Sequence, residues 1–314
     1  MINVRTIAKV AELFYIYGFS QYEIAKKFNF SAAKISRIIK EAKRRKLINF
    51  TIINFDKRIL TLERDLENYG GLKEAIIYYN SDFENYDDDI IFQELGNLGA
   101  EYLERVIKDG LNIALTWGMT LNRFIDKINY DKEYRLNIFS TLGGVQLKIP
   151  EVESNYLIQM MSTKIGGTPY PIYIPLLLEK NEYKTILSQK SDIKKILGSG
   201  SEIDYYFSSV GTINEKSRVC TLDGFDIDFI EELKSKGIVG EIGLHFFDRN
   251  GNFIKSGIED RIINLSIEEL RKIKNKIIIV FGKEKIEALK GFLKTGLCDV
   301  IITDSKTTEL LLEK

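Results

Sequence analysis

The sequence is poor in the residues that reactive centres and cross-links require. Its 314 residues include two cysteines and one histidine. The cysteines, Cys220 and Cys298, are too few for a disulfide framework and lack the spacing of metal ligands, so we expect both to pack as small apolar side chains. With a single histidine, His245, a Ser-His-Asp triad or a zinc site has little material, and we expect this residue to serve packing or hydrogen bonding.

Long apolar segments and nucleotide-binding loops are also missing. No apolar run reaches the roughly 18 to 20 residues needed to cross a bilayer, and the first residues lack the apolar core of a signal peptide. We therefore expect a cytoplasmic protein without a membrane partner. No Walker-type loop occurs, and no GxGxxG follows a predicted strand. The acidic run at 87–89 is expected to form a solvated loop or a helix start, and we expect no metal, no cofactor and no catalytic residue.

Charge is unevenly distributed along the chain, although the formal net charge is zero. Residues 1–50 hold 11 of the 45 basic residues but only three of the 45 acidic ones, so they carry +8 and the remainder carries −8. A basic segment suits contact with the phosphate backbone of DNA, because each neutralised phosphate releases condensed counterions. Charge alone is equally compatible with a solvated basic surface, so the residue pattern within this segment has to decide.

The basic segment has the pattern of three short helices. An apolar stripe at every third or fourth position predicts a first helix over residues 3–17. Ser20 and Glu23 have the spacing of a capping box and predict the start of a second helix, in which the small Ala25 allows another helix to cross closely. Asn29 stands where a left-handed turn residue is needed, because asparagine tolerates that conformation best after glycine.

The third helix is expected to read DNA. Ser31 caps it, and Ile35, Ile38 and Ala42 form its buried face. Short polar residues near its start, with basic residues behind them, suit a helix that enters the major groove of double-stranded DNA. We therefore predict DNA contacts from Ser31, Ala32, Ala33, Lys34, Ser36, Arg37, Lys40, Arg44 and Arg45. The alternative is a helical packing or dimerisation module, but the tight spacing and the charge of +8 favour DNA binding.

The chain is expected to form two domains. We predict a winged or three-helix helix-turn-helix domain over residues 1–54, with a strand-like alternation at 48–53. An effector-binding and oligomerisation domain is predicted over residues 55–314, and its first segment, 55–71, is predicted to be a connector helix.

The second domain alternates apolar strands with amphipathic helices, which is typical of a doubly wound α/β fold with a mostly parallel sheet. The predicted strands span residues 74–79, 112–117, 135–142, 205–210, 276–281 and 299–303. The predicted helices span residues 91–107, 121–128, 152–165, 226–236 and 284–293.

Glycines follow four of these strands: Gly118, Gly143 with Gly144, Gly211, and Gly282. In open α/β sheets, ligands bind beyond the carboxyl ends of the strands, where helix N-termini offer backbone amides to anions. A single glycine can serve a tight turn alone. Four at one edge, one accompanied by the hydroxyl of Thr120 and another by Lys283 and Lys285, predict a phosphorylated ligand.

Several segments together resemble the SorC family of bacterial transcriptional regulators over almost the whole chain. They are GFSQYEIAKKFNFSAAKISRIIKEAKRRKLI (18–48), LERDLENYGGLKEAII (62–77), TWGMTL (116–121), TLGGV (141–145), VGEIGLHFFDRNG (239–251), DRIINLSIEELRKI (260–273) and VFGKEKIEALKGFLKTGLCDVIITD (280–304). No single segment is specific, but their combination in this order is.

The resemblance implies an effector domain akin to sugar-phosphate isomerases that senses its ligand instead of converting it. It also implies a homo-oligomer, typically a tetramer, that binds operator DNA and responds to a phosphorylated sugar or polyol. Together with Gly211 from the strand-end pattern, the matched motifs predict effector contacts from Gly118, Met119, Thr120, Leu121, Gly143, Gly144, Asn155, Glu241 and Lys285. Two positions depart from the family pattern: Met119 replaces a basic or small residue, and Glu241 replaces aspartate.

An enzyme is the alternative interpretation of the second domain. A sugar-phosphate isomerase or deaminase fused to a DNA-binding head would need a positioned acid–base pair in its cleft. Glu241, Asp204 and Lys285 are the candidates, but no recognisable catalytic motif surrounds them. A constitutive architectural DNA-binding protein would leave the α/β domain without a role. We therefore predict a DNA-binding regulator without enzymatic activity.

Substitutions in the third helix test its assignment. Arg37→Ala should weaken binding to the cognate operator about tenfold or more, and more than it weakens binding to random DNA, because a base contact is lost. Reversing the charge of Arg44 and Arg45 should weaken binding to the operator and binding to random DNA alike. It should also make the affinity depend less steeply on salt concentration, because phosphate contacts are lost. Fluorescence anisotropy titrations at several salt concentrations measure both effects. Unchanged DNA binding in both variants would contradict the recognition-helix assignment.

Overall fold

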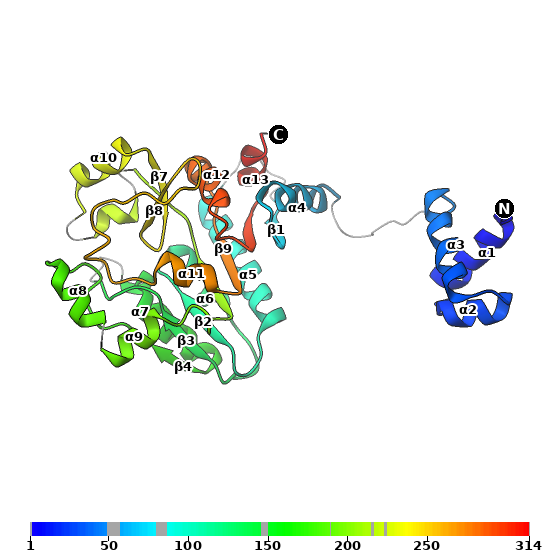
Figure 1. Cartoon of the computed structure of the whole chain (residues 1–314), viewed down its shortest axis with the longest axis horizontal. Coiled ribbons are helices and arrows are strands. Elements are labelled where there is room, and N and C mark those ends of the chain that lie inside the picture. The colour runs from blue at the N-terminus through cyan, green and yellow to red at the C-terminus, as the bar shows by residue number, and fades with distance from the viewer. Residues whose placement is uncertain are drawn as a thin grey trace. The chain divides into compact units, whose positions relative to one another are not determined.

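The computed structural model of the chain (Figure 1) forms two compact units, residues 1–55 and 56–314. The structure describes residues 2–48, 57–79, 87–145, 150–188, 190–214, 217–222 and 225–313. The strand expected at 48–53 falls almost entirely outside the described residues, so it stays a prediction.

The first unit contains the three expected helices: α1 (Val4–Tyr15), α2 (Gln21–Phe28) and α3 (Ala32–Arg44). The capping box is present, because the Ser20 amide donates to Glu23 Oε2 at 2.8 Å and the Glu23 amide donates to Ser20 Oγ at 3.3 Å. Asn29 has a φ of 52°, the left-handed conformation that the turn requires. The sequence therefore determined both the start and the end of α2.

The three helices enclose a small apolar core of their own. Its members come from all three helices: Ile7, Val10, Ala11, Ile24, Ala25, Ile35, Ile38, Ile39 and Ala42. The predicted buried face of α3 is confirmed, and Ile39 adds to it. Burial of these side chains leaves the basic residues of α3 at the surface.

The second unit is built on a seven-stranded sheet in the order β1-β10-β9-β5-β2-β3-β4. Its strands are β1 (Glu74–Tyr78), β2 (Asn112–Leu115), β3 (Asn137–Ser140), β4 (Thr168–Tyr170), β5 (Tyr205–Ser208), β9 (Asn275–Ile279) and β10 (Val300–Asp304). Each of the six predicted strands is present with slightly different bounds. The three-residue β4 contains Pro169, which argues against a strand by sequence and is tolerated here at a sheet edge. Every neighbouring pair is parallel, so all the carboxyl ends lie at one edge.

A smaller antiparallel sheet was not predicted. It consists of β6 (Gly211–Thr212), β7 (Ile238–Ile242) and β8 (His245–Asp248) in that order. β7 and β8 are joined by a two-residue turn, Gly243-Leu244, in which both residues have positive φ values of 56° and 64°. The usual sequence signal for such a turn is Asn-Gly or Asp-Gly, which is absent here.

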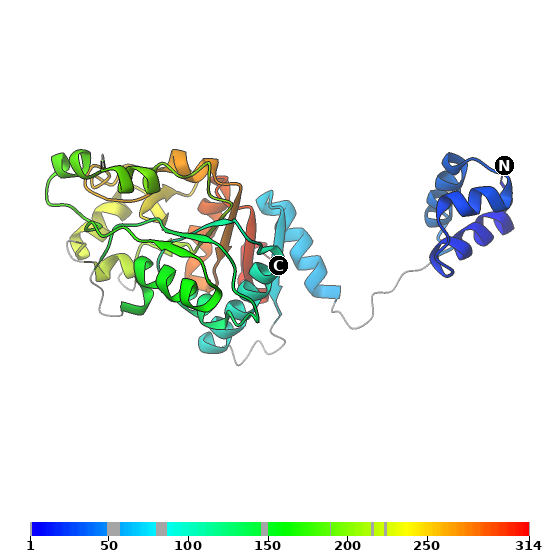
Figure 2. The ribbon, with the colours of Figure 1, turned by 90° about the horizontal axis from the view of Figure 1, so that it is seen from below.

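Helices cover both faces of the seven-stranded sheet, so the expected doubly wound α/β arrangement is confirmed (Figure 2). The helices are α4 (Lys57–Gly70), α5 (Asp88–Val106), α6 (Met119–Lys127), α7 (Ser154–Ile165), α8 (Asn181–Ser188), α9 (Ser191–Leu197), α10 (Ile227–Ser235), α11 (Ile267–Lys272), α12 (Ile286–Lys294) and α13 (Ser305–Leu311). Short 3-10 turns occur at η1 (Pro150–Val152), η2 (Arg218–Thr221) and η3 (Lys283–Lys285). α5, α6 and α7 pack on one face, and α4, α9, α11, α12 and α13 pack on the other.

Within the described residues, no helix combines the length and the apolar character that a membrane span needs. Both cysteines pack against apolar core clusters, as expected.

The outer edge of the sheet is covered by α4. β1 is an edge strand, and such a strand leaves a row of backbone amides without a strand partner. Two glutamates of α4 accept from them: Ala75 N–H donates to Glu67 Oε1 at 3.1 Å, and Ile77 N–H donates to Glu63 Oε1 at 3.2 Å. The helix that follows the first unit in the chain is thereby fixed to the sheet by side-chain carboxylates as well as by the buried Leu66.

The adjacent glycines after β3 provide a matched test of backbone packing. A Cβ atom at Gly143 would lie 2.8 Å from both the carbonyl oxygen of Ile174 and the Cα of Leu176, whereas at Gly144 the nearest atom would be 3.4 Å away. Gly143→Ala should lower the free energy of unfolding by about 1–3 kcal/mol, because backbone has to move. Gly144→Ala should stay within about 0.5 kcal/mol of the parent. Chemical denaturation measures both, and equal stabilities would contradict this packing.

Candidate functional site

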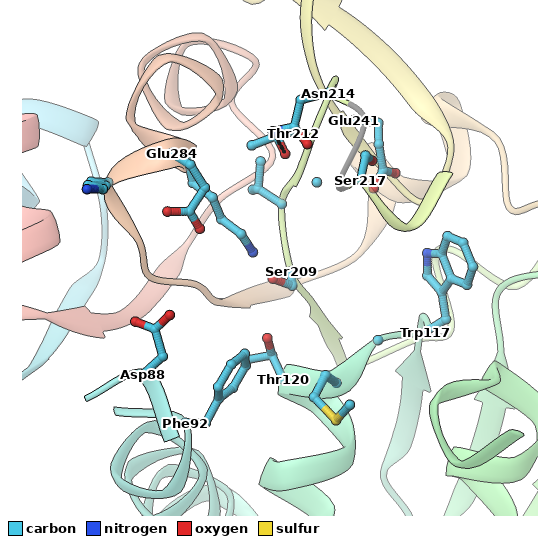
Figure 3. Close-up of a pocket in the computed structure, with 16 residues that line it drawn as sticks. Asp88, Phe92, Trp117, Thr120, Ser209, Thr212, Asn214, Ser217, Glu241 and Glu284 are labelled. Atoms are coloured by element: carbon cyan, nitrogen blue, oxygen red, sulfur yellow. Dashed lines mark hydrogen bonds between the residues drawn. The ribbon is translucent and has the colours of Figure 1, made fainter. Parts of the chain in front are cut away.

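A cavity of about 510 Å³ lies at the carboxyl edge of the seven-stranded sheet (Figure 3). It is bounded by residues after β2, β5 and β9, by the starts of α5 and α6, and by β6 and β7. Its walls are formed by Asp88, Phe92, Trp117, Gly118, Met119, Thr120, Ser209, Val210, Gly211, Thr212, Asn214, Ser217, Glu241, Lys283, Glu284 and Lys285. Parallel strand pairing is what brings these distant segments together.

The N-terminus of α6 forms one wall of the cavity. Gly118 is the N-cap residue with a φ of 126°, a conformation that favours glycine, and no side chain caps the helix. The first amides of a helix have no acceptor within it, and Met119 and Thr120 of this first turn line the cavity. The macrodipole adds partial positive charge at the same place. This wall therefore suits an anion.

The η3 turn contributes positive charge from the opposite direction. Lys283 and Lys285 line the cavity directly after Gly282, which has a φ of 113°. The side chain of Glu284 folds back against Gly282, where a Cβ atom would collide with its carboxylate. Lysine side chains beside free helix amides are the combination that recognises phosphate groups.

Glu241 is the most buried ionisable group of the cavity, with only 5% of its surface exposed. Its Oε2 accepts a hydrogen bond from the Leu244 amide at 2.8 Å, which ties the carboxyl to the β7–β8 turn. Burial raises the pKa of Glu241 from 4.5 to about 7, against the opposing effects of this hydrogen bond and the charge of Lys285. Gly211 pairs with Glu241 across the small sheet, and a methyl group at that position would collide with the carboxylate.

A buried hydroxyl on the cavity wall is unpartnered. Within the described residues, Ser209 Oγ makes no hydrogen bond. The neighbouring Ser208 hydroxyl, in contrast, accepts from Thr116 Oγ1 at 3.1 Å and donates to the Ser209 carbonyl at 3.2 Å. Buried polar groups are usually satisfied, so an unpartnered hydroxyl at a cavity indicates a polar ligand.

Six of the ten effector residues expected from the sequence line this cavity: Gly118, Met119, Thr120, Gly211, Glu241 and Lys285. The other four, Leu121, Gly143, Gly144 and Asn155, lie outside its lining. Leu121 is fully buried in the apolar core below α6. Asn155 uses its side-chain amide on the backbone of Ile172, accepting from the amide at 2.8 Å and donating to the carbonyl at 3.0 Å. In this structure Leu121 and Gly143 serve packing and Asn155 binds backbone, and an effector contact of these four residues stays a prediction.

Sequence reasoning missed several residues of the cavity. Thr212 and Glu284 lie in loops that follow expected glycines, so extending each strand-end loop by a few residues would have found them, whereas Lys283 was already part of the strand-end pattern. Asp88 and Phe92 come from the start of α5. Of the two alternatives for the acidic run, a solvated loop or a helix start, the structure has the helix start, with Asp87 as the N-cap. Ser217 carries no sequence signal, because it reaches the cavity through the unpredicted small sheet region.

The acid–base candidates of the enzyme interpretation are not all brought together. Asp204 precedes β5, at the opposite edge of the sheet, where it accepts from Lys274 Nζ at 2.7 Å and from the Asn112 amide at 3.0 Å. Only Glu241 and Lys285 of the three candidates line the cavity. His245 is outside the lining as well: its Nε2 lies 2.8 Å from the Leu265 carbonyl, as expected for a hydrogen-bonding residue. Burial lowers its pKa, against the opposing effect of this hydrogen bond.

The predicted DNA-contacting residues lie on the surface of the first unit. Ser31 is the N-cap of α3, and its Oγ accepts from the Lys34 amide at 3.2 Å. Lys34 Nζ lies 3.6 Å from the centre of the Phe30 ring, a cation–π contact that holds it near the helix start. Ser36 is half-buried, and the other eight are exposed: Ser31, Ala32, Ala33, Lys34, Arg37, Lys40, Arg44 and Arg45.

The last two arginines of this surface share one carboxylate. Arg44 binds Glu41 through two of its three side-chain nitrogens, Nε at 2.8 Å and Nη2 at 2.6 Å, and Arg45 Nε donates to the same carboxylate at 2.6 Å. These bonds lower the pKa of Glu41 to about 2. The three side chains together keep one net positive charge and a fixed orientation. This arrangement presents guanidinium groups at the end of α3 that is farther from Ser31.

Comparisons with known proteins agree with this architecture. The family described as "Putative sugar-binding domain" matches residues 57–313. The chain is 26% identical over 303 residues to the deoxyribonucleoside regulator of Bacillus subtilis, covering 96% of each chain. It is 22% identical over 317 residues to the sorbitol operon regulator of Klebsiella pneumoniae, covering 99% of this chain and 98% of the regulator.

The crystal structure of the full-length sorbitol operon regulator SorC from Klebsiella pneumoniae has the same fold, with a TM-score of 0.76, 21% identity and 99% coverage of both chains. The family match covers well over half of the chain and contains the whole cavity. With its helix-turn-helix unit and its effector-type α/β unit, the chain belongs to the SorC family of sugar-binding transcriptional regulators.

Proposed function

We propose that this transcriptional regulator binds a phosphorylated sugar or polyol in the cavity at the carboxyl edge of the sheet, and double-stranded operator DNA through α3. We further propose that it acts in the cytoplasm as a homotetramer, and that the cavity senses its ligand without converting it. Residues 1–54 serve DNA binding in this proposal, and residues 55–314 serve effector binding and oligomerisation, with 55–71 as the connector.

The observation that carries the proposal is that helix amides and two lysines line one cavity, which the carboxyl groups of Asp88, Glu241 and Glu284 also line. The free amides at Met119 and Thr120 and the charges of Lys283 and Lys285 line the same space. A phosphate monoester is an anion of up to two negative charges with several acceptor oxygens, which matches these donors. The unpartnered hydroxyl of Ser209 supplies a further polar contact, suited to a hydroxyl-rich ligand.

Glu241 is compatible with an anionic ligand because it does not have to be charged. With a pKa of about 7, a large share of the Glu241 side chains is protonated near neutral pH. A protonated carboxyl donates one hydrogen bond and does not repel a phosphate. Lys285 lines the same cavity, and its positive charge favours the ionised form of Glu241. In our proposal, an anionic ligand that binds Lys285 therefore favours the protonated form of Glu241.

The volume of the cavity and the names of the relatives narrow the class of ligand. A cavity of about 510 Å³ falls within the range of roughly 300–1,000 Å³ typical of small-molecule sites. Relatives named after a deoxyribonucleoside and after sorbitol direct the search to pentose phosphates and polyol phosphates. In our proposal, binding favours one arrangement of the subunits over another and so changes the spacing of paired DNA-binding heads, which requires different effector affinities in the two arrangements.

A ligand panel tests the proposed function. 2-Deoxyribose 5-phosphate, ribose 5-phosphate, sorbitol 6-phosphate and inorganic phosphate are compared with the unphosphorylated sugars by thermal unfolding. We expect at least one phosphoester to raise the melting temperature, since a ligand that binds only the folded state stabilises it. Lys285→Met should weaken binding of that compound about tenfold or more, because a charge-assisted contact is lost.

The matched control is Lys255→Met, which removes an exposed lysine outside the cavity and should leave binding unchanged. Chemical analysis of the same mixtures reports turnover. Stabilisation without turnover supports a sensor, whereas conversion of any compound would favour the enzyme, and a flat response to every phosphoester would refute the anion site.

Glu241→Gln tests the buried carboxyl. Because the folded-state pKa is raised from 4.5 to about 7, the folded protein holds a proton that the unfolded chain releases between these pH values. The free energy of unfolding is therefore highest below about pH 4.5. It falls by about 3 kcal/mol as the pH rises to about 7, where the folded protein also loses the Glu241 proton. The glutamine variant has no ionisable group at this position. Its stability relative to that of the parent protein should therefore increase as the pH rises across the same range. Melting temperatures of the two proteins at pH 5, 6, 7 and 8 test this prediction. If the difference between parent and variant is the same at every pH, the pKa of Glu241 is not raised.

A further inference from the structure

A buried side chain from outside the cavity lining binds the start of the η3 turn. The Gly282 amide, at the start of this turn, donates to Thr307 Oγ1 at 2.9 Å. The turn itself is short and closes on the Lys285 amide, which donates to the Gly282 carbonyl at 3.0 Å. The position of Lys285 at the cavity therefore depends on how Gly282 is anchored.

Thr307 is a rigid anchor. Only 1% of its surface is exposed, and its own amide donates to Asp304 Oδ1 at 3.1 Å, in the N-cap bond of α13. The adjacent Thr308 hydroxyl also serves α13 itself, because it donates to the Asp304 carbonyl at 2.8 Å. Of these two neighbouring threonines, Thr307 is the one whose hydroxyl binds the start of the η3 turn, whereas the Thr308 hydroxyl binds within its own helix turn.

α13 also packs against the helix that follows the DNA-binding head in the chain. It contacts α4, β1 and α12 (Figure 1). Leu311 of α13 belongs to the same apolar cluster as Leu62 and Leu66 of α4. α4 in turn is bonded to the edge of β1 through Glu63 and Glu67. A continuous set of contacts thus runs from the η3 turn through α13 to α4.

We propose that Thr307 is a positioning residue: its hydroxyl fixes the η3 turn, and through it Lys285, and so couples occupancy of the cavity to α4 by way of α13. This inference rests on the proposed function, because it takes the cavity as the effector site. Thr307 itself is outside the cavity lining, so it acts through the turn and not on the ligand. Contiguous contacts define the route, and coupling along it is what the experiment measures.

Amide hydrogen exchange on the full chain tests the route, with inorganic phosphate as the probe and sodium chloride at equal ionic strength as the reference. In the parent protein, phosphate should slow exchange at the start of α6, in the η3 turn, in α13 and in α4. Slowing at α6 reports occupancy of the anion site directly, because residues 119 and 120 line the cavity. Slowing in α4 reports the coupling, because α4 contributes no residue to the cavity lining.

Three variants distinguish a role of Thr307 in positioning the η3 turn from a general effect on the stability of the protein. Thr307→Val removes the acceptor and leaves the buried Gly282 amide unsatisfied, so phosphate affinity should fall about tenfold and the α4 response should disappear. Thr307→Ser retains the hydroxyl and should restore both. Thr308→Val is the matched control: it removes a hydroxyl of the same helix turn that does not contact η3, and it should keep the parent's affinity and the parent's α4 response.

The outcomes distinguish this inference from the function on which it rests. No protection at α6 in the parent protein would overturn the proposed anion site and, with it, the coupling. Protection at α6 with unchanged exchange in α4 would leave the anion site standing and overturn the coupling alone, and this comparison needs no variant. Equal affinity and equal α4 response in Thr307→Val and the parent would show that Thr307 does not position the turn.

Discussion

Parallel pairing of seven strands is the constraint on which the site depends. Because every neighbouring pair runs in the same direction, the residues that follow β2, β5 and β9 meet at one edge although they are far apart in sequence. The strands are buried on both faces, so the helices that cover them start or end at that edge as well. The cavity is a consequence of this geometry: helix amides at the start of α6 and lysines of η3 reach one space although they follow different strands.

The fold could be predicted from the sequence wherever the local signal was strong and the segment long. Apolar strands and their following glycines were evident, and the capping box at Ser20 and the left-handed Asn29 determined the limits of α2. The small sheet was not predictable, because β6 has two residues and the β7–β8 turn uses Gly243-Leu244, where positive φ at leucine has no propensity signal. That turn is stabilised by a local hydrogen bond, since the Leu244 amide donates to the side chain of Glu241, three residues earlier in β7.

The cavity was predictable in part, for a related reason. Glycine after a strand indicates a ligand edge only on average, because glycine also serves close packing. Gly118 and Gly211 border the cavity, whereas Gly143 is required by the nearby backbone of Ile174 and Leu176. Sequence could not separate these uses, since the difference is which other segment passes within van der Waals distance. The protonation behaviour of Glu241 was equally inaccessible, because it arises from burial that only the folded chain creates.

The carboxylates of α4 affect whether the protein stays soluble after a protease cuts the chain. Glu63 and Glu67 occupy outward-facing amides of β1, the last strand of the sheet. A protease that cuts the chain between α4 and β1 and releases the helix would bare a strand ready to pair with another molecule, and intermolecular sheet growth would compete with solubility. A cut before residue 57 leaves this shield in place. α4, which follows the first unit in the chain, therefore also protects the edge of the sheet from pairing with a second molecule.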